Sequence, residues 1–332
     1  MPSSPIPVSL LRYLIMWKVN SSMVFLPKGF PVELSLVLGT LIGNRLATQE
    51  AGAWKKALAP LAEYYAQSRD KNSKTPPPIP EIAWPLEATL LAYPGKRSYG
   101  NGELIIWELK LFSASAEHGF FLELILPAME EAGYTSDLQW NHSRRLWGHF
   151  DVHEVYVASG SHWEPLVKDG RLDLRYRPTP VQWAEGHAFG ADAQRMFSSL
   201  SWLTPFDLRG ISSTPNLSEH AANPSLTLQI VLEALIARVS RMISGRHKLR
   251  EGVSAILNND KQASLQRALE ESARLDLLGK NLTSPPPYWP GAWIGTQTYA
   301  PIPASIIPYL ELASILHIGR HTHLGCGTFR LS

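Results

Sequence analysis

Residues Ile307–Leu331 read IPYLELASILHIGRHTHLGCGTFRL, and this stretch decides how the end of the chain folds. The apolar run before residue 317 predicts a short helix over Ile306–Leu316, and Thr328–Leu331 predicts a final strand. The loop between them contains Gly319, Gly325 and Gly327. Glycine adopts positive φ and lets the backbone approach a phosphate chain closely, while Arg, His and backbone N–H groups can hydrogen-bond it. The loop therefore indicates a phosphate-binding element, with Arg320, His321 and His323 as further candidate contacts.

The same helix and strand close a longer pattern in the second half of the chain. A strand is expected over Phe197–Leu208, and an amphipathic helix over Leu226–Ile243. A further helix is expected over Gln262–Leu278, followed by paired strands within Ser284–Tyr299. With the closing helix and strand, the order of elements is that of a βαββαβ unit.

The first half repeats this order. The expected elements are a strand at Leu10–Val19, helices at Val32–Ala47 and Trp54–Gln67, strands at Leu86–Tyr93 and Glu103–Phe112, a helix at Glu117–Ala132 and a strand at Trp147–Val157. The repeat predicts an α+β protein of two tandem ferredoxin-like, RRM-like domains. We expect residues 1–160 to form the first domain, 161–195 to be a connecting segment and 196–332 to form the second domain with the glycine loop.

Composition excludes several classes of protein. The 332 residues include 31 Lys and Arg against 29 Asp and Glu, so the net charge is +2 and no affinity for polyanions arises from bulk charge. The one cysteine, Cys326, cannot form an internal disulfide and fits a reducing compartment, so we expect a cytoplasmic protein. The apolar run Val8–Trp17 is too short for a membrane span and is interrupted by Arg12, so no membrane partner is expected.

The C-terminal stretch resembles the end of a known family. Its Leu316-His317-Ile318-Gly319-Arg320 step, followed by Gly325-Cys326-Gly327 at the strand entry, is similar to the CRISPR-associated, RAMP-superfamily endoribonucleases that process precursor CRISPR RNA. Weaker similarities occur in the same order: Leu26-Pro27 before a helix with Gly39 and Gly43, the Tyr99–Glu103 turn, and Leu203-Thr204-Pro205.

The resemblance implies a function in antiviral defence. It implies that CRISPR repeat RNA binds in a groove between the halves and is cut without a metal or other cofactor. The ribose 2′-OH would attack the adjacent phosphate and leave a 2′,3′-cyclic phosphate and a 5′-OH. Further partners implied are other CRISPR effector subunits.

Clustered cations support RNA binding despite the low net charge. Arg238, Arg241, Arg246, Lys248 and their neighbours His247 and Arg250 fall within thirteen residues and predict a phosphate track. Arg144 and Arg145 follow Trp140 and His142, and Lys96-Arg97 precedes Tyr99, combinations suited to backbone contact and base stacking. The alternative is that each run is a solvated surface.

The catalytic residues are predicted from the chemistry of cleavage. Attack by a 2′-OH needs a base, an acid and a cation. Many members of the family carry a histidine on the first helix, whereas this chain has none before His118. We therefore expect Arg45 and Lys55 to supply charge and His142 to be the imidazole; the alternative is a non-catalytic RNA-binding RAMP subunit.

A second alternative is a metal site. His317, His321, His323 and Cys326 supply four possible zinc ligands in ten residues, which would fit a zinc-dependent hydrolase or a structural zinc site. His317 follows an apolar run and is expected to be a packed structural residue. His149 and His153 lie on one face of their expected strand and are also expected to be structural.

Overall fold

The computed structural model describes residues 4–68, 79–81, 84–93, 96–135, 145–191, 196–210, 226–244, 249–286 and 289–332. The chain forms two compact units. The first unit is Ser9–Glu185, and the second unit is Gly186–Ser332 together with Met1–Val8. No helix within the described ranges is long and apolar enough to cross a membrane.

The first unit is built on an antiparallel sheet. Its order is β3 (Ala88–Ala92), β5 (Leu104–Phe112), β1 (Leu10–Val19), β6 (Phe150–Ser159), β7 (His162–Lys168) and β8 (Arg171–Leu172). The first four strands thus lie in the spatial order second, third, first and fourth, which is the ferredoxin-like order. β7 and β8 extend this sheet beyond the motif.

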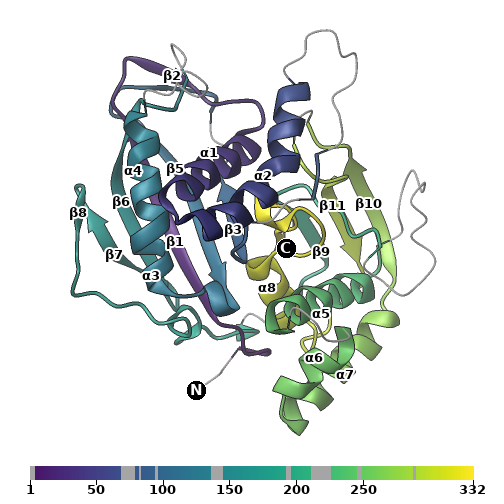
Figure 1. Ribbon diagram of the computed structural model, residues 1–332. Helices are drawn as coiled ribbons and strands as arrows, with labels where there is room; N and C mark the ends of the chain where they lie inside the picture. Colours follow the sequence, from purple (N-terminus) through teal and green to yellow (C-terminus); the bar gives the residue numbers. More distant parts are fainter. Residues whose placement is uncertain are drawn as a thin grey trace. The chain divides into compact units, whose positions relative to one another are not determined.

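Helices cover one face of this sheet (Figure 1). They are α1 (Phe30–Arg45), α3 (His118–Phe120), a π-helical turn at Phe121–Ile125 and α4 (Leu126–Tyr134), and α2 (Thr48–Ser68) lies on α1. α2 packs closely on α1 because Gly39 and Gly43 have no side chain: a Cβ at Gly39 would lie 2.9 Å from Leu58, and one at Gly43 would lie 3.2 Å from Trp54. The spacing of these two glycines thus brings the helices together.

Aromatic side chains form the centre of the first core. Trp17 of β1 stacks on Phe150 of β6 at 4.1 Å between ring centroids, and it meets Trp107 of β5 edge-on at 5.2 Å. Trp17, Trp107 and Trp147 are fully buried. A separate ribbon pairs β2 (Met23–Phe25) with β4 (Ser98–Gly100).

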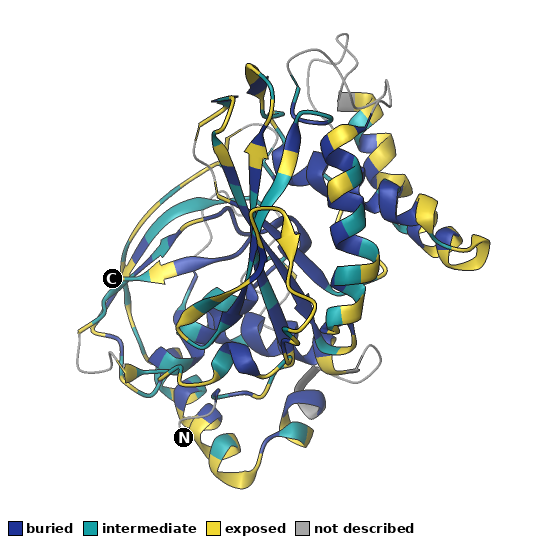
Figure 2. Ribbon diagram, turned by 90° about the vertical axis from the view of Figure 1, so that its left-hand side faces the viewer, coloured by how far each residue is buried: buried dark blue, intermediate teal, exposed yellow. Residues whose placement is uncertain are grey.

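The second unit repeats the same order of strands. Its sheet is β10 (Leu277–Thr283), β11 (Ile294–Tyr299), β9 (Ser199–Trp202) and β12 (Phe329–Leu331), all antiparallel. The helices are α5 (Leu228–Ser244), α6 (Leu249–Ile256), α7 (Asn259–Ala273) and α8 (Ile307–Leu316). The residues of α5 from Leu228 to Ser240 are buried or partly buried, whereas α7 buries only Leu265, Ala268 and Ser272 (Figure 2 colours the residues by burial). The predicted α+β fold of two tandem ferredoxin-like domains is confirmed.

Several elements differ from the expected ones. The segment 161–195, expected to be a connection, contains β7 and β8, which pair with the first sheet, and a 3-10 helix at Gln182–Ala184. β9 is shorter than expected because the chain turns away at Thr204-Pro205, and proline cannot donate to a strand ladder. The helix expected to reach residue 278 ends at Ala273, and Leu277 already belongs to β10.

Candidate nucleic-acid interface

The glycine loop between α8 and β12 is shaped by positive φ angles. Gly319, Gly325 and Gly327 have φ of 102°, 81° and 85°. A Cβ at Gly327 would lie 1.9 Å from the Ile318 carbonyl oxygen, and one at Gly319 would lie 2.6 Å from the Asp207 carbonyl oxygen. The structure therefore gives these two glycines a packing role: they let the loop backbone pass directly against other backbone.

Backbone hydrogen bonds attach this loop to the segment that follows β9. The Gly327 N–H donates to the Pro205 carbonyl at 2.9 Å, and the Arg320 N–H donates to the Asp207 carbonyl at 2.8 Å. Two segments more than 100 residues apart in sequence are thus held in one fixed arrangement, which is a condition for a pre-organised binding surface.

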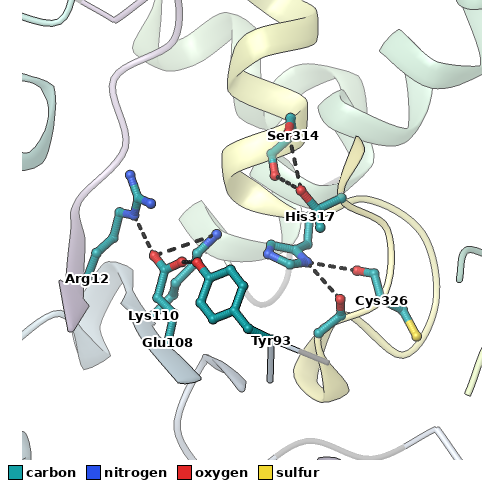
Figure 3. Close-up of polar contacts among 9 residues, drawn as sticks. Arg12, Tyr93, Glu108, Lys110, Ser314, His317 and Cys326 are labelled. Atoms are coloured by element: carbon teal, nitrogen blue, oxygen red, sulfur yellow. Dashed lines mark hydrogen bonds and ion pairs between the residues drawn. The ribbon is translucent and has the colours of Figure 1, made fainter. Parts of the chain in front are cut away.

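His317 is a structural residue of this loop, as expected. Its side chain is fully buried, and its Nδ1 lies 3.0 Å from the Cys326 carbonyl oxygen and 3.2 Å from that of Gly325 (Figure 3). A carbonyl oxygen only accepts hydrogen bonds, so Nδ1 carries the proton and donates. The ring closes the loop and is withdrawn from solvent.

His321 and His323, which the sequence predicts as RNA ligands, are largely buried in the structure. The first is 9 % exposed and the second 4 % exposed, because the 3-10 helix Thr322–Leu324 folds the loop inward. His321 also has the left-handed φ of 57°. The described loop therefore offers little imidazole surface, and its exposed polar group is the arginine that precedes them.

Arginine side chains from three segments gather at the loop, and we call them the arginine cluster: Arg209, Arg241 and Arg320. Arg209 donates from Nε and a terminal nitrogen to the two carboxylate oxygens of Asp207 at 2.9 and 2.8 Å. A terminal nitrogen of Arg320 lies 3.8 Å from the same carboxylate, and Arg241 donates to the Gly319 carbonyl at 3.4 Å. The side chains of Arg209 and Arg320 are 38 % and 42 % exposed, and Arg241 is exposed.

Asp207 fixes the charge at the centre of the cluster. Burial alone would raise the pKa of its carboxyl group, but the hydrogen bonds from Arg209 and the charges of Arg209 and Arg320 outweigh burial and hold the pKa below its ordinary value. The group is therefore an anion at neutral pH. Arg209 and Arg320 lie at this carboxylate and Arg241 lies at the backbone of the loop, and guanidinium groups are suited to contact a phosphate backbone.

Arg238 is a correction to the predicted phosphate track. It is only 4 % exposed, and its Nε donates to the Leu316 carbonyl at 3.4 Å. That carbonyl is at the C-terminal end of α8, where backbone acceptors lack partners in the helix. Arg238 is thus a helix cap, while Arg241, three residues later on α5, stays exposed; the predicted Arg246 and Lys248 lie outside the described residues.

The predicted catalytic residues of the first unit occupy separate surroundings. The Arg45 Nε donates to a Glu131 carboxylate oxygen at 2.8 Å, in a pair that is about one third exposed on each side. Lys55 is exposed on α2 and lines a cavity of about 190 Å³ with Asn44 and Trp54. His142 and the RNA-binding candidate Arg144 lie outside the described residues.

Arg145 belongs to a buried polar group. Its terminal nitrogen lies 3.8 Å from the carboxylate of Glu33, which is 4 % exposed and also accepts hydrogen bonds from Trp147 at 2.6 Å and Tyr65 at 2.7 Å. Burial first, and then Glu33, raise the pKa of Tyr65 to about 12. Arg145, 37 % exposed, therefore neutralises a buried carboxylate as well as reaching solvent.

Sequence reasoning did not identify a second charged network, on β1 and β5. The Arg12 Nε donates to Glu108 at 2.6 Å, the Tyr93 hydroxyl donates to the other carboxylate oxygen at 3.0 Å, and the Lys110 ammonium lies 3.9 Å away (Figure 3). Glu108 and Lys110 are 1 % and 2 % exposed. The signal was present in LIIWELKLF, where two charges two residues apart interrupt an apolar strand.

The geometry does not favour zinc at the end of the chain. The possible ligands His317, His321, His323 and Cys326 do not bring three donor atoms close together. Among the described residues, three such donors lie close together at a different place, at His153, Glu154 and Asp169. Burial also raises the pKa of the Cys326 thiol, which disfavours the thiolate that zinc requires.

The fold and the site define a protein of two ferredoxin-like domains with an arginine-lined glycine loop in the second. Residues 200–329, which span β9 to β12, match the family model of the CRISPR-associated endoribonuclease Cas6. The predicted resemblance to the CRISPR-associated endoribonuclease family is confirmed by this match, which is carried by the second half of the chain. No curated protein matches the chain.

Two solved structures share the fold over 99 % of the chain. A "Partial Cas6-RT-Cas1--Cas2 complex" is 11 % identical in sequence, with a TM-score of 0.52. The match covers 99 % of this chain and 47 % of the chain in that complex. A second "Cas6-RT-Cas1--Cas2 complex" has the same identity and TM-score, and there the coverage of the other chain is 29 %. Thermus thermophilus Cas6 is 11 % identical with a TM-score of 0.44, covering 98 % of this chain and 99 % of its own. The chain therefore spans less than half the length of the first two.

Proposed function

We propose that the chain is an endoribonuclease that binds CRISPR repeat RNA and processes precursor CRISPR RNA. The observation that carries this proposal is the arginine cluster on the glycine loop, within the segment that matches the Cas6 family model. The cleavage reaction is attack of a ribose 2′-OH on the adjacent phosphate, without a metal ion, giving a 2′,3′-cyclic phosphate and a 5′-OH.

The arginine cluster binds the phosphate backbone in this proposal. Guanidinium groups form paired hydrogen bonds to phosphate, and they stay charged at all relevant pH values. Asp207 orients Arg209 through two hydrogen bonds, so its fork is ordered before RNA arrives. Gly319, Gly325 and Gly327 keep the loop in the conformation that places Arg320 beside it. His321 and His323 complete the loop's polar interior.

Cleavage needs groups that the first unit supplies. Arg45 and Lys55 stabilise charge on the phosphorane, and His142 transfers the proton. The pair of Arg45 with Glu131 is partly exposed and therefore weak, so a phosphate can compete for the guanidinium. Arg144 and Arg145, which follow His142 closely in sequence, would contact the RNA.

The proposal is tested by incubating the full chain with end-labelled repeat RNA in excess chelator. Specific cutting in chelator supports a metal-independent endoribonuclease. Loss of cutting in chelator, with recovery on adding a divalent ion, overturns the metal-independent mechanism.

A second candidate function is a non-catalytic RNA-binding subunit. The observation that favours it is the absence of histidine from the first helix, since the residues of α1 are FPVELSLVLGTLIGNR. Tight binding of repeat RNA by the wild-type chain with no cutting under any condition would support it against the nuclease.

Partners other than RNA are proposed from two similar structures, each of a Cas6-RT-Cas1--Cas2 complex. We expect this chain to associate with other CRISPR proteins. Affinity purification from cells that express the chain with those proteins measures this association.

A further inference from the structure

A histidine and two carboxylates meet on the sheet extension of the first unit, among residues to which the proposed function gives no role. The donor atoms of His153, Glu154 and Asp169 all lie within 4.8 Å of one another. The first two are partly exposed and Asp169 is exposed. An ion from solvent can therefore reach all three donors.

A β-bulge brings the first two donors together. Consecutive residues of a strand normally point to opposite faces, so a histidine and the following glutamate would be kept apart. In β6, Glu154 pairs with Met16 and Val152 pairs with Trp17, which leaves His153 as the extra residue without a partner on β1. A bulge re-aims a side chain in this way, and it corrects the expectation that His149 and His153 simply share a strand face.

The third donor comes from the tight turn between β7 and β8. Asp169 and Gly170 both have positive φ, 50° and 71°, which is typical of a two-residue hairpin turn of type I′. The Gly170 N–H donates to the His153 carbonyl at 2.9 Å. The turn is therefore anchored on the bulge itself, and the backbone holds Asp169 beside the other two donors.

The Glu154 carboxylate is oriented by a hydrogen bond, and neither carboxylate is paired with a lysine or arginine among the described residues. The Tyr156 hydroxyl donates to Glu154 at 2.8 Å, as outer-shell groups do in metal sites. The pKa of Tyr156 is raised, first by this hydrogen bond and further by the nearby charge of Asp169. Within the described residues, neither Glu154 nor Asp169 has an ion pair with lysine or arginine. Two uncompensated negative charges beside an imidazole favour a cation.

We propose that His153, Glu154 and Asp169 bind a divalent transition-metal ion of the Zn²⁺ type. One nitrogen and two oxygen donors suit zinc, and water would complete the coordination. The ion would join β6 to the turn between β7 and β8, and so fix the sheet extension. The site is independent of the proposed cleavage reaction.

The test is calorimetric titration of the metal-free full chain with Zn²⁺ alone. We expect one equivalent to bind, and we expect His153→Ala and Asp169→Asn each to weaken binding about tenfold or more. Asparagine tolerates positive φ, so the second variant keeps the turn. His162→Ala and Glu164→Gln, at exposed positions of the neighbouring β7, are matched controls that should bind as the wild type does.

Unchanged Zn²⁺ binding in both His153→Ala and Asp169→Asn would overturn the proposal, and so would no binding by the wild-type chain. Loss of binding in Cys326→Ala with retention in His153→Ala would place the ion at the C-terminal histidines instead. Thermal unfolding of each metal-free variant, which we expect to match that of the wild type, verifies that the variants are folded. Since the readout is zinc binding, its failure is separate from any failure of RNA cleavage.

Discussion

The backbone N–H of Arg320 donates to the backbone carbonyl of Asp207 at 2.8 Å, so the glycine loop is fixed to the segment that follows β9. The same two residues also meet through their side chains, at 3.8 Å. The position of the Arg320 guanidinium is therefore set by the fold of the second unit, and this makes the arginine cluster a surface whose function can be tested by single substitutions.

Arg241→Ala and Arg320→Ala are each expected to weaken binding of repeat RNA about tenfold, since each removes a charged hydrogen-bond donor. Each should also reduce the slope of log affinity against log salt concentration by about 0.7. Filter binding at several salt concentrations measures both. Arg330→Ala, at an exposed position of β12 in the same unit, is the matched control. An unchanged slope in both cluster variants would reject the phosphate contacts.

Arg238→Ala distinguishes a helix-capping role of Arg238 from a phosphate-binding role. The variant leaves the Leu316 carbonyl without its buried donor, so we expect the free energy of unfolding to fall by about 1–3 kcal/mol. The salt slope of RNA binding should stay at the wild-type value, in contrast to Arg241→Ala. Chemical denaturation and salt-dependent binding measure the two effects. If the variant has a reduced salt slope but an unchanged free energy of unfolding, Arg238 contacts RNA and is not a helix cap.

Gly327→Ala is expected to destabilise the second unit by more than about 2 kcal/mol, because the new methyl group meets the Ile318 carbonyl at a left-handed φ. Gly210→Ala is the control, since Gly210 also has a positive φ, of 72°, but nothing within 4 Å of a Cβ. Strain alone should lower its stability by about 1 kcal/mol. Equal losses in the two variants, measured by denaturation, would contradict the close backbone packing.

Glu108 is expected to make stability depend on acid pH. Burial alone would raise the pKa of its carboxyl group, but Arg12 and Lys110 outweigh burial and hold the pKa below its ordinary value. The network therefore contributes fully above the unfolded-state pKa of about 4.3, and its contribution is lost as the pH falls through the lower folded-state pKa.

Glu108→Gln tests this dependence. The variant should lose about 3 kcal/mol near neutral pH, because two cations remain at the buried site without their carboxylate. It should also show a flatter decline in stability below about pH 4.3 than the wild type does. Urea denaturation from pH 3 to pH 7 measures both, and parallel curves for the two proteins would show that Glu108 does not cause the decline.

Arg45→Ala, Lys55→Ala and His142→Ala test the catalytic assignment. Each should slow cleavage of repeat RNA about a hundredfold or more with less effect on binding. Glu131→Ala is the control for Arg45, since it breaks the same ion pair but keeps the guanidinium. If Glu131→Ala slows cleavage as much as Arg45→Ala does, the ion pair has a structural role. If Arg45→Ala, Lys55→Ala and His142→Ala all cleave the RNA at the wild-type rate, the catalytic assignment is wrong.

The sequence patterns predicted the fold better than they predicted the site. Leu10–Val19 is a strand with the expected bounds, because its large apolar residues alternate in burial and polar residues follow it. The sequence also predicted the glycine loop between α8 and β12, because its glycines occupy positions with positive φ. The extension by β7 and β8 was not predicted, because its residues are mostly exposed and show no strong apolar periodicity.

The partners of single side chains depend on tertiary contacts, and local pattern does not encode these. Arg238 and Arg241 share a helix face at three-residue spacing, yet one caps α8 in the interior and the other is exposed. Arg209 was not predicted for the site because its role depends on Asp207, and that carboxylate is placed by a turn after a shortened strand.

The most direct measurement is end-group analysis of repeat RNA cut by the full chain in excess chelator. The proposed mechanism predicts one specific cut, with a 2′,3′-cyclic phosphate on one fragment and a 5′-OH on the other. Fragments with a 5′-phosphate and a 3′-OH, or cutting only after a divalent ion is added, would contradict it.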